Sequence, residues 1–385
     1  MVGVQSMAER TGKAVLYDPV QQNFIMRSYA FPVPQPGEVL VRLTCCTICG
    51  SDLHTYTGKR CETTDLCVLG HEMVGVIETL GDLEMRDYHG NLLKKGDRVT
   101  WSMVVSCGAC FYCTHGLSQK CIAKFKYGHD DWDGVPTGGL AEHCLLKEGT
   151  PIFKVPDSLV DIVVAPANCA VATVAAAARL VQETHPIAGS RILITGSGML
   201  GLVATCFLTE LNGEVVVAEP NAKRRKQAKS FGATLCVDPN DPGELDRTFQ
   251  SFTEGEGFDI CLDFSGHNSG VEQCLDSVRV GGCVMLVGSV FPTDSIELNP
   301  EVLVRKMLTI RGLHNYRPDD LATAIDFLTR TSSTYPFAEL IGRLFRLDES
   351  EQAFDFALQE SPIRVGIVML PKWMNDQGFG NIVNP

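Results

Sequence analysis

Four cysteines stand close together in the first third of the chain, at Cys107, Cys110, Cys113 and Cys121. Their spacings of three, three and eight residues allow the four sulfur atoms to meet at one metal ion. Thiolate sulfur is a soft ligand, and four thiolates in a tetrahedron suit zinc. Because four protein ligands leave no open coordination position, such a site is expected to be structural and not catalytic.

A second set of cysteine and histidine residues lies outside this cluster. A reactive zinc site uses three protein ligands and keeps one position open. Cys49 and His71 are the first two candidates. The third ligand is expected near the junction of two domains, where Cys169 stands. Asn168 would take that position after a shift of one residue, but an amide is the poorer zinc ligand, so Cys169 is preferred.

Polar neighbours of these ligands are suited to support them. Asp52 and Glu72 adjoin the ligands and are expected to orient the His71 ring or tune the metal, and Glu72 could also ligate transiently. Ser51 could pass on a proton from a zinc-bound substrate hydroxyl, and His54 could deliver it to water. For His54 the alternative is a surface histidine without a role.

A glycine motif, Gly196-Ser-Gly198-Met-Leu200-Gly201, follows a short apolar strand and opens an apolar helix. This context makes the motif specific for a dinucleotide. The first glycine permits a tight turn, the second lets the backbone approach a pyrophosphate, and the third allows helix and strand to pack closely. The backbone of this segment, Leu200 included, is therefore expected to bind the cofactor.

Glu219 ends the strand that follows this helix. A carboxylate there accepts hydrogen bonds from a ribose 2′-hydroxyl and repels a 2′-phosphate, which favours NAD over NADP. Lys223, Arg224 and Arg225 come next, and one of them could reach a phosphate; we assign Arg224 to the cofactor site. The other two are expected to lie on a solvated helix face.

The elements that carry these motifs divide the chain into a β-rich part and an alternating part. Short strands are predicted at 39–44 and 74–79, and 96–100 is predicted as a turn that enters a strand; 82–95 before it is mostly polar and is expected to be a surface loop. From about residue 165 helices and strands alternate, which indicates a parallel sheet with helices on both faces. The strands are predicted at 191–195, 215–218, 235–237, 258–263 and 283–288, and the helices at 170–181, 202–211, 223–231 and 271–278. The alternation is expected to end near Arg311, after which 363–369 returns to the first domain.

Composition excludes several classes of function. The chain has 385 residues, of which 45% are hydrophobic and 21% charged, as in a globular protein of two domains. A net charge of −13 argues against nucleic acid or an anionic membrane as a partner. No apolar run is long enough to span a bilayer, and the first ten residues lack an apolar signal core, so we expect a cytoplasmic protein. Its sixteen cysteines are then better interpreted as metal ligands and buried thiols than as disulfides.

Taken together, these motifs resemble the zinc-dependent medium-chain dehydrogenase/reductase family, which includes the alcohol, sorbitol and threonine dehydrogenases. The segments Cys49-Gly-Ser-Asp-Leu-His54 and Gly70-His71-Glu72, the four-cysteine lobe and the glycine motif carry the resemblance over nearly the whole chain. The segments Lys126-Tyr-Gly-His129 and Gly138-Gly-Leu-Ala-Glu-His143 look closer to a bacterial subgroup. That subgroup includes proposed phosphonate-catabolism alcohol dehydrogenases and a hydroxycamphor dehydrogenase.

The resemblance implies a fold and a reaction. The fold would be a GroES-like β-rich catalytic domain, residues 1–168 and 313–385, interrupted by a Rossmann NAD-binding domain with a doubly wound parallel sheet, residues 169–312. Thr173 matches a residue that contacts the nicotinamide, and Arg364 matches one that binds the pyrophosphate. The activity would be reversible NAD-linked oxidation of an alcohol, more often secondary than primary, by a homodimer or homotetramer that carries a catalytic and a structural zinc ion per chain.

Three alternatives stay open at this point. The substrate could be a hydroxyalkylphosphonate, for which His129, Lys126 and Arg317 are candidate cations. The chain could be a non-catalytic nucleotide-binding module on the same fold, although such a module has no need of an open metal site. It could also be a zinc-free quinone or enoyl reductase, from which a metal analysis would distinguish it.

Overall fold

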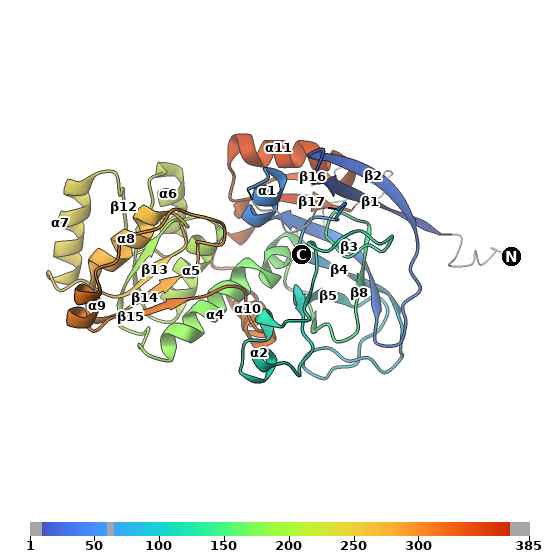
Figure 1. Ribbon diagram of the computed structural model, residues 1–385, viewed down its shortest axis with the longest axis horizontal. Helices are drawn as coiled ribbons and strands as arrows, with labels where there is room; N and C mark the ends of the chain where they lie inside the picture. The colour runs from blue at the N-terminus through green and yellow to red at the C-terminus, as the bar shows by residue number, and fades with distance from the viewer. Residues whose placement is uncertain (1–9, 60–64, 370–385) are drawn as a thin grey trace. The chain divides into compact units, whose positions relative to one another are not determined.

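The computed structural model describes residues 10–59 and 65–369 of the chain. These residues form two compact units. The first contains the described part of Met1–Cys169 together with Arg317–Ser332 and the described part of Phe337–Pro385, and the second contains Ala170–Tyr316 with Ser333–Pro336. Each unit has its own sheet (Figure 1).

The first unit is built on a seven-stranded sheet in which most neighbours are antiparallel. Its order is β16 (Ile341–Arg346), β17 (Arg364–Val368), β3 (Val39–Ile48), β4 (Glu72–Leu80), β5 (Arg98–Trp101) and β9 (Ile152–Lys154), and β8 (His143–Leu146) also pairs with β3. The hairpin of β1 (Thr11–Asp18) and β2 (Asn23–Ala30) and the short pair β6 (Val104–Val105) and β7 (Phe125–Lys126) complete its strands. The strand β17 pairs with β3, so the segment predicted to return to the first domain does so.

Helices of the first unit are mostly short near the predicted ligands and longer toward the end of the chain. They are α1 (Gly50–Tyr56), α2 (Phe111–Thr114), α3 (Asp161–Val164), α10 (Pro318–Thr331) and α11 (Ser350–Glu360). A buried apolar cluster joins the sheet to the β1–β2 hairpin and to α11, with Trp101, Tyr127 and Phe354 among its fully buried side chains. This packing fixes the end of β3, from which α1 starts.

The second unit holds a parallel sheet, as predicted; it has six strands, because β15 (Thr309–Gly312) joins the five predicted ones. Its order is β12 (Leu235–Val237), β11 (Glu214–Ala218), β10 (Arg191–Thr195), β13 (Phe258–Asp263), β14 (Val278–Leu286) and β15 (Thr309–Gly312). The helices are α4 (Ala170–Gln182), α5 (Met199–Glu210), α6 (Ala222–Ser230), α7 (Pro242–Thr253), α8 (Asn268–Ser277) and α9 (Pro300–Lys306). The chain runs outward from β10 in one direction and from β13 in the other, and right-handed connections then place helices on both faces (Figure 1).

Several bounds of the predicted pattern are wrong. The helix predicted at 271–278 runs from Asn268 to Ser277, the strand predicted at 283–288 already starts at Val278, and the helix predicted from 202 starts at Met199. The alternation of helix and strand also does not end near Arg311, because α10, β16, α11 and β17 continue it. These later strands join the sheet of the first unit, where β16 and β17 are parallel.

Among the described residues, no single helix is both long enough and apolar enough to span a membrane. One bent pair, Asp161–Asn168 with Ala170–Gln182, would meet that requirement by length and composition alone.

Candidate active site

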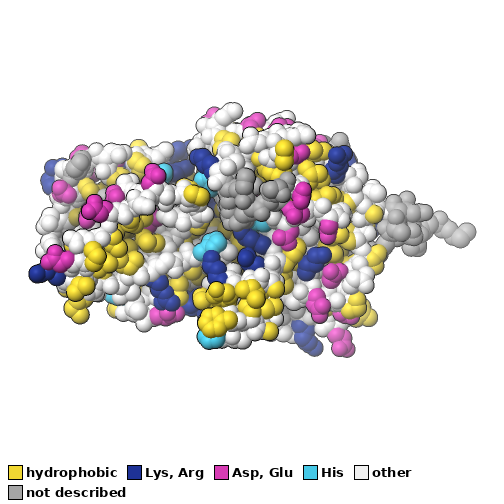
Figure 2. Space-filling model, viewed as in Figure 1, with side chains coloured by type: hydrophobic (Ala, Val, Ile, Leu, Met, Phe, Trp, Pro, Cys, Tyr) yellow, Lys and Arg dark blue, Asp and Glu magenta, His cyan; other side chains and the backbone are white. Residues whose placement is uncertain are grey.

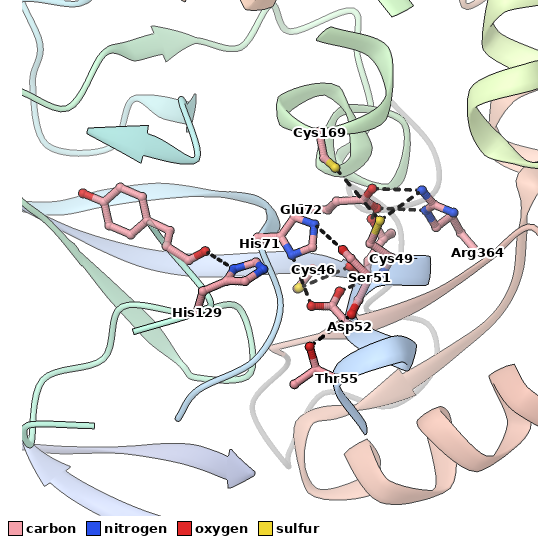
Figure 3. Close-up of polar contacts among 12 residues, drawn as sticks. Cys46, Cys49, Ser51, Asp52, Thr55, His71, Glu72, His129, Cys169 and Arg364 are labelled. Carbon is pink, nitrogen blue, oxygen red and sulfur yellow. Dashed lines mark hydrogen bonds and ion pairs between the residues drawn. The ribbon is translucent and has the colours of Figure 1, made fainter. Parts of the chain in front are cut away.

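Four side chains of the first unit converge on one point, and three of them come from neighbouring strand ends. Cys49 follows β3, while His71 and Glu72 stand at the start of β4 beside it. Cys169 comes from the turn before α4. Their ligand atoms all lie within 4.8 Å of one another, and the two sulfur atoms are 4.0 Å apart (Figure 3). The structure thus brings together the residues that the sequence proposed for a reactive metal site.

The alternative third ligand lies elsewhere. Asn168 is fully buried, and its side-chain amide donates a hydrogen bond to the carbonyl of Trp101 at 3.1 Å. Cys169, one residue later, carries the sulfur that reaches the cluster. The geometry therefore favours Cys169, as the chemistry of the two side chains had suggested.

Asp52 links the start of α1 to the imidazole of His71. Its Oδ2 accepts the backbone N–H of Cys49 at 2.8 Å, which caps the first turn of the helix. Its Oδ1 lies 3.1 Å from Nδ1 of His71. Both side chains are almost fully buried. A carboxylate in this position fixes the ring and its tautomer, so that Nε2 faces the other ligands.

The same contact makes His71 a strong base. Burial acts to lower the pKa of His71, but the Asp52 carboxylate outweighs it and raises that pKa to about 10. A glycine is needed just before the ring: Gly70 has a φ of +89°, and a Cβ there would lie 2.7 Å from the sulfur of Cys46. Asp52 and Gly70 together place a strongly basic imidazole at the cluster.

Cys49 is the thiol of the cluster that ionises most readily. The thiol of Cys169 donates to its sulfur and lowers the pKa of Cys49 well below the usual range, an effect that burial opposes. The guanidinium of Arg364, 3.6 Å from the Cys49 sulfur, acts in the same direction. A thiolate is the form that ligates a metal.

Glu72 lies beside the ligands in a buried network. Its carboxylate accepts from Nε and Nη2 of Arg364 at 3.0 and 3.1 Å, and from the hydroxyl of Thr47 at 2.5 Å. Burial, which Arg364 opposes, raises the pKa of Glu72 to about 7. The resemblance gave Arg364 a pyrophosphate contact, and that role stays a prediction; in the first unit its guanidinium binds Glu72.

The donor set fits zinc. Two sulfur ligands at about 2.3 Å from a tetrahedral zinc ion are separated by roughly 3.8 Å, close to the 4.0 Å between Cys49 and Cys169. Cys49, His71 and Cys169 form the cysteine and histidine ligand set typical of catalytic zinc. Glu72 can add a fourth protein ligand only if its carboxylate leaves Arg364.

The four-cysteine lobe forms a second cluster in the same unit. Cys107, Cys110 and Cys113 surround the start of α2, and Cys121 follows a short 3₁₀ turn. The sulfur of Cys107 lies 3.4 Å from that of Cys121 and 4.0 Å from that of Cys113, which is 3.5 Å from Cys110. The backbone N–H groups of Cys113 and Ile122 lower the pKa of Cys110 to about 6. All four sulfurs lie within 4.8 Å of one another, so this set fits the closed structural site.

The glycine motif lies at the carboxyl end of β10 in the second unit, where it borders a pocket of about 430 Å³. Gly196 has a φ of +87° and turns the chain out of the strand. A Cβ on Gly201 would lie 2.0 Å from the carbonyl of Gly196, whereas one on Gly198 would meet nothing within 4 Å. The three glycines thus have the local geometry expected of a tight turn, an open approach and a close packing contact. Leu200 lies in the first turn of α5.

Glu219 and Arg224 line the same pocket. The Glu219 carboxylate is buried and accepts the backbone N–H groups of Ser197 at 2.7 Å and Asn221 at 2.9 Å. Arg225 points elsewhere, because its Nη1 donates to the carbonyls of Glu219 and Pro220 and pairs with Asp238. Of the two arginines, Arg224 is therefore the one that lines the pocket, and its contact with a cofactor stays a prediction.

The remaining predicted residues lie at different distances from the metal cluster. The hydroxyl of Ser51 is 3.4 Å from Nε2 of His71 (Figure 3). His54 is half-buried one turn further along α1. Thr173 is buried in the first turns of α4, in the second unit. The roles given to these three residues stay predictions.

Two residues near the cluster were not identified as part of it. Thr47 holds Glu72, and the ring of His129 lies 5.0 Å from that of His71 (Figure 3). Thr47 falls inside the predicted β-rich part, where nothing in the one-dimensional pattern distinguishes it. The sequence identifies His129 only as a candidate cation. It does not predict that the ring of His129 lies beside that of His71.

Comparison with known proteins agrees with this geometry. The model of the alcohol dehydrogenase GroES-like domain matches residues 35–157, and that of the zinc-binding dehydrogenases matches residues 200–330. L-threonine 3-dehydrogenase of Pyrococcus furiosus is 32% identical over 291 residues, which cover 73% of this chain and 77% of that protein. The 5-exo-hydroxycamphor dehydrogenase of Pseudomonas putida is 26% identical over 345 residues, 87% and 93% of the two chains.

A solved structure shows the same architecture. A Sinorhizobium meliloti protein described as a zinc-binding dehydrogenase, with NADP bound, superposes with a TM-score of 0.80 at 25% identity, over 94% of this chain and all of that one. The predicted GroES-like and Rossmann folds are confirmed by these matches. The chain belongs to the zinc-dependent medium-chain dehydrogenase family, whose members are oxidoreductases.

Proposed function

We propose that this protein catalyses the reversible oxidation of a secondary alcohol to a ketone, with NAD as the hydride acceptor. The observation that carries the proposal is the convergence of buried Cys49 and His71 with half-buried Cys169, with the Ser51 hydroxyl 3.4 Å from His71. A purely structural or nucleotide-binding module has no use for a three-ligand metal site beside a hydroxyl. A zinc-free reductase on the same fold has no use for the ligands.

The residues of the metal cluster and their buried neighbours would have different roles. Cys49, His71 and Cys169 would hold a zinc ion, which supplies Lewis acidity that lowers the pKa of an alcohol. Asp52 holds the His71 ring in its ligating tautomer through the 3.1 Å contact at Nδ1. Arg364 keeps the Glu72 carboxylate paired, so that the catalytic position stays open to substrate.

Proton transfer is assigned to α1. Ser51, at the start of that helix, would take up the hydroxyl proton of the alcohol as it passes its own proton on. His54 would then deliver the proton to water, since an imidazole titrates near neutrality. We assign these steps to the catalytic domain and the cofactor to the Rossmann domain. The expected bounds, 1–168 and 313–385 for the first and 169–312 for the second, differ from the two units of the structure, which place Cys169 in the first unit and 313–316 in the second.

The cofactor is assigned from the pocket of the second unit. The backbone of Gly196–Gly201 and the start of α5 suit a pyrophosphate, and the nicotinamide would accept the hydride. Glu219 places a carboxylate where a 2′-phosphate would be repelled, which supports NAD. Arg224 lines the same pocket and is the residue that could admit NADP, the cofactor bound by the Sinorhizobium meliloti relative.

The substrate class rests on two observations. Gly50, next to Cys49, stands where liver-type enzymes carry a basic residue, and a Cβ built there meets nothing within 4 Å. The hydroxyl groups named in threonine 3-dehydrogenase and in 5-exo-hydroxycamphor dehydrogenase are both on secondary carbons. We therefore rank a neutral secondary alcohol first.

A hydroxyalkylphosphonate ranks second, because it needs a cation near the metal. Of the three candidates, His129 lies beside His71, whereas Arg317 directly precedes α10 (Pro318–Thr331) and its Nη2 is 3.9 Å from Asp319. Lys126 lies in β7, three residues before His129.

Metal analysis and turnover test the proposal together. Purified, unchelated protein should contain two zinc ions per chain, one for each ligand cluster. It should then produce NADH from 2-butanol or a cyclic secondary alcohol with a higher kcat/KM than from a hydroxyalkylphosphonate. A protein without zinc, or one that turns over none of a broad alcohol panel with either NAD or NADP, would refute it. A phosphonate preference above about tenfold, roughly 1.4 kcal/mol, would reverse the ranking of substrates.

We also propose that the protein forms a homodimer or homotetramer in the cytoplasm. The strand β15 ends its sheet, and Val304 of the neighbouring α9 and Met307 just after that helix are 75% and 74% exposed. Hydrophobic side chains, drawn in yellow, also lie at the surface elsewhere on the face shown (Figure 2). An unpaired edge strand beside exposed apolar side chains favours pairing with a second copy. Light scattering would measure the state, and a monomer at micromolar concentration would contradict it. Both metal clusters need reduced thiols, which supports the cytoplasm.

A further inference from the structure

The last residue of β13, Asp263, is a fully buried carboxylate at the centre of the second unit. Its Oδ1 accepts from the hydroxyl of Thr195 at 2.9 Å, and from the backbone N–H and hydroxyl of Ser265 at 3.0 and 2.5 Å. Its Oδ2 accepts the N–H of Gly266 at 3.3 Å. Burying a carboxylate is costly, so a buried one must be held by several donors. Here the donors come from the end of β10 and from the loop that follows β13.

The ends of β10 and β13 lie side by side at the point where the winding of the sheet reverses. Thr195 and Asp263 are paired in register at the carboxyl ends of β10 and β13. From these two strands the chain runs outward in opposite directions, and ligands bind at such a switch point. The loops that follow the two strands, 196–198 and 264–267, line the pocket of about 430 Å³.

Ser265, which is hydrogen-bonded to Asp263, contacts two segments that line this pocket, the glycine loop and the start of α8. On one side a Cβ on Gly196 would lie 2.7 Å from the Cα of Ser265, so the two loops are in close contact. On the other side the Ser265 hydroxyl accepts the N–H of His267, the residue before α8. A Cβ on Gly270 of that helix would lie 2.3 Å from the same hydroxyl oxygen. A shift of Ser265 would therefore move the glycine loop and the start of α8 together.

We propose that Asp263 is a positioning residue for the dinucleotide. It touches neither the cofactor nor the reacting atoms; it holds Ser265 against Gly196 and thereby keeps the pocket in the shape that binds the cofactor. The inference rests on the proposed NAD-linked function. It deepens that function by naming a residue on which cofactor affinity depends, and this residue belongs to a different unit from the metal ligands.

Direct NADH binding tests this role. Asp263→Asn keeps the size of the side chain but replaces an acceptor oxygen with an NH₂ group, which opposes donors such as Gly266 N–H. A hydrogen bond to a charged group contributes about 1.5–3 kcal/mol, so the Kd for NADH should rise by at least about tenfold. The KM for NAD should rise in parallel, while kcat at saturating NAD changes less than about twofold, since the metal site is intact.

A matched control separates positioning from loss of stability. Thr253 is also buried in the second unit; its hydroxyl donates to the carbonyl of Phe249 at 2.7 Å and accepts the N–H of Gly257. Thr253→Val should lower the Tm yet leave the Kd for NADH within about twofold. If Thr253→Val weakens NADH binding as much as Asp263→Asn does, or if Asp263→Asn leaves the Kd unchanged, the positioning role is wrong.

Two further variants keep the test decisive. Should Asp263→Asn fail to fold, Ser265→Ala removes the hydroxyl that donates to Asp263 and accepts the N–H of His267, and it should still raise the Kd at least about threefold. Thr195→Val should raise the Kd for NADH when it is made in the wild type, but raise it little further in the Asp263→Asn variant, because both substitutions break the hydrogen bond from Thr195 to Asp263. If the effects of the two substitutions on the binding free energy are fully additive, this coupling is wrong. Failure of the proposed function is recognised separately, since wild-type protein would then bind neither NADH nor NADPH.

Discussion

The carboxylate of Glu72 and the guanidinium of Arg364 form a two-point contact, at 3.0 Å from Nε and 3.1 Å from Nη2, between residues 292 positions apart in the sequence. The pair joins β17 to β4 across β3, so the return of the chain to the first unit also completes the metal site. Thr47 on β3, between them, donates to the same carboxylate. The proposed zinc ligand His71 directly precedes Glu72 in the chain. Loss of the contacts that Arg364 and Thr47 make to Glu72 is therefore expected to move His71 as well.

Arg364→Met should destabilise the protein strongly. Removing one partner of a buried ion pair leaves the other charge uncompensated, at a cost of about 3–5 kcal/mol. Urea unfolding measures the loss. The exposed pair of Arg305 and Glu301 provides the control, and Arg305→Met should have no measurable effect. Adding Glu72→Gln to Arg364→Met should recover part of the lost stability. If the double variant is less stable than Arg364→Met alone, the uncompensated charge of Glu72 is not the cause of the destabilisation.

Cys49→Ala and His71→Ala should each abolish alcohol oxidation while NADH binding is retained. The metal ligands lie in the first unit, whereas the glycine motif belongs to the second. Metal analysis should show a fall from two zinc ions to one, and NADH fluorescence should report an unchanged Kd. A folded Cys49→Ala protein that has lost NADH binding would show that the two sites are not separable.

Cys113→Ser should lower stability more than it lowers the intrinsic activity of the folded fraction. Metal binding by four thiolates is coupled to folding, so the weakened lobe is expected to release its zinc and promote aggregation. Thermal unfolding and zinc content give the readouts. Cys236, half-buried in β12 and outside both clusters, supplies the control, and Cys236→Ser should keep two zinc ions. Equal zinc loss in both variants would argue against the assigned lobe.

Glu219 should set the choice of cofactor. We expect the wild-type kcat/KM to favour NAD over NADP, because the carboxylate repels a 2′-phosphate. Glu219→Gln should shift the ratio toward NADP, and Arg224→Ala should shift it back. Because Glu219 also accepts the N–H of Ser197, a parallel loss of affinity for both cofactors is expected in Glu219→Gln. A wild type that prefers NADP would mean that Arg224 outweighs Glu219.

How far the sequence predicts this molecule depends on the range of the interactions involved. The strands β10 and β13 have the predicted bounds, because a short apolar run between turn residues is a local signal. The helices α7, α10 and α11 were not predicted. Two of them, α10 and α11, belong to the first unit, and which sheet a helix covers is decided by partners far away in the sequence.

The same distinction separates the site residues. The spacing of cysteine and histidine along the chain is enough to indicate Cys49, His71 and the four-cysteine lobe. The choice of Cys169 over Asn168 depends on the direction of a turn, which a one-residue shift reverses. The Asp263 network could not be predicted either, since its hydrogen bonds to Thr195 cross 68 positions of sequence. A polar residue at the carboxyl end of a buried strand is the one local signal that points to it.

Stability should fall below neutral pH through His143, a residue that the site does not use. His143 starts β8 with its Nδ1 3.0 Å from the hydroxyl of Tyr29 and its ring 4.4 Å from that of Phe31. Burial lowers the pKa of His143 to about 4, and nearby Arg42 and Arg10 oppose the charge further, although Glu78 favours it. The folded protein therefore keeps this imidazole neutral at a pH where the unfolded chain already binds a proton.

The sign of the effect follows from that difference. Above a pH of about 6.5 the imidazole is neutral in both states, so its contribution to stability is complete; it is lost as the pH falls from there toward 4. The shift corresponds to a loss on the order of 3 kcal/mol. Other groups, the metal ligands among them, also titrate in this range, so the wild type is best compared with His143→Gln, which cannot titrate at this position. His143→Gln should be the less stable protein at pH 8, and the gap in unfolding free energy should close as the pH is lowered to 5. A gap that stays constant between pH 8 and pH 5 would show that the pKa of His143 is the same in the folded and the unfolded protein, and that its burial does not have the effect inferred here.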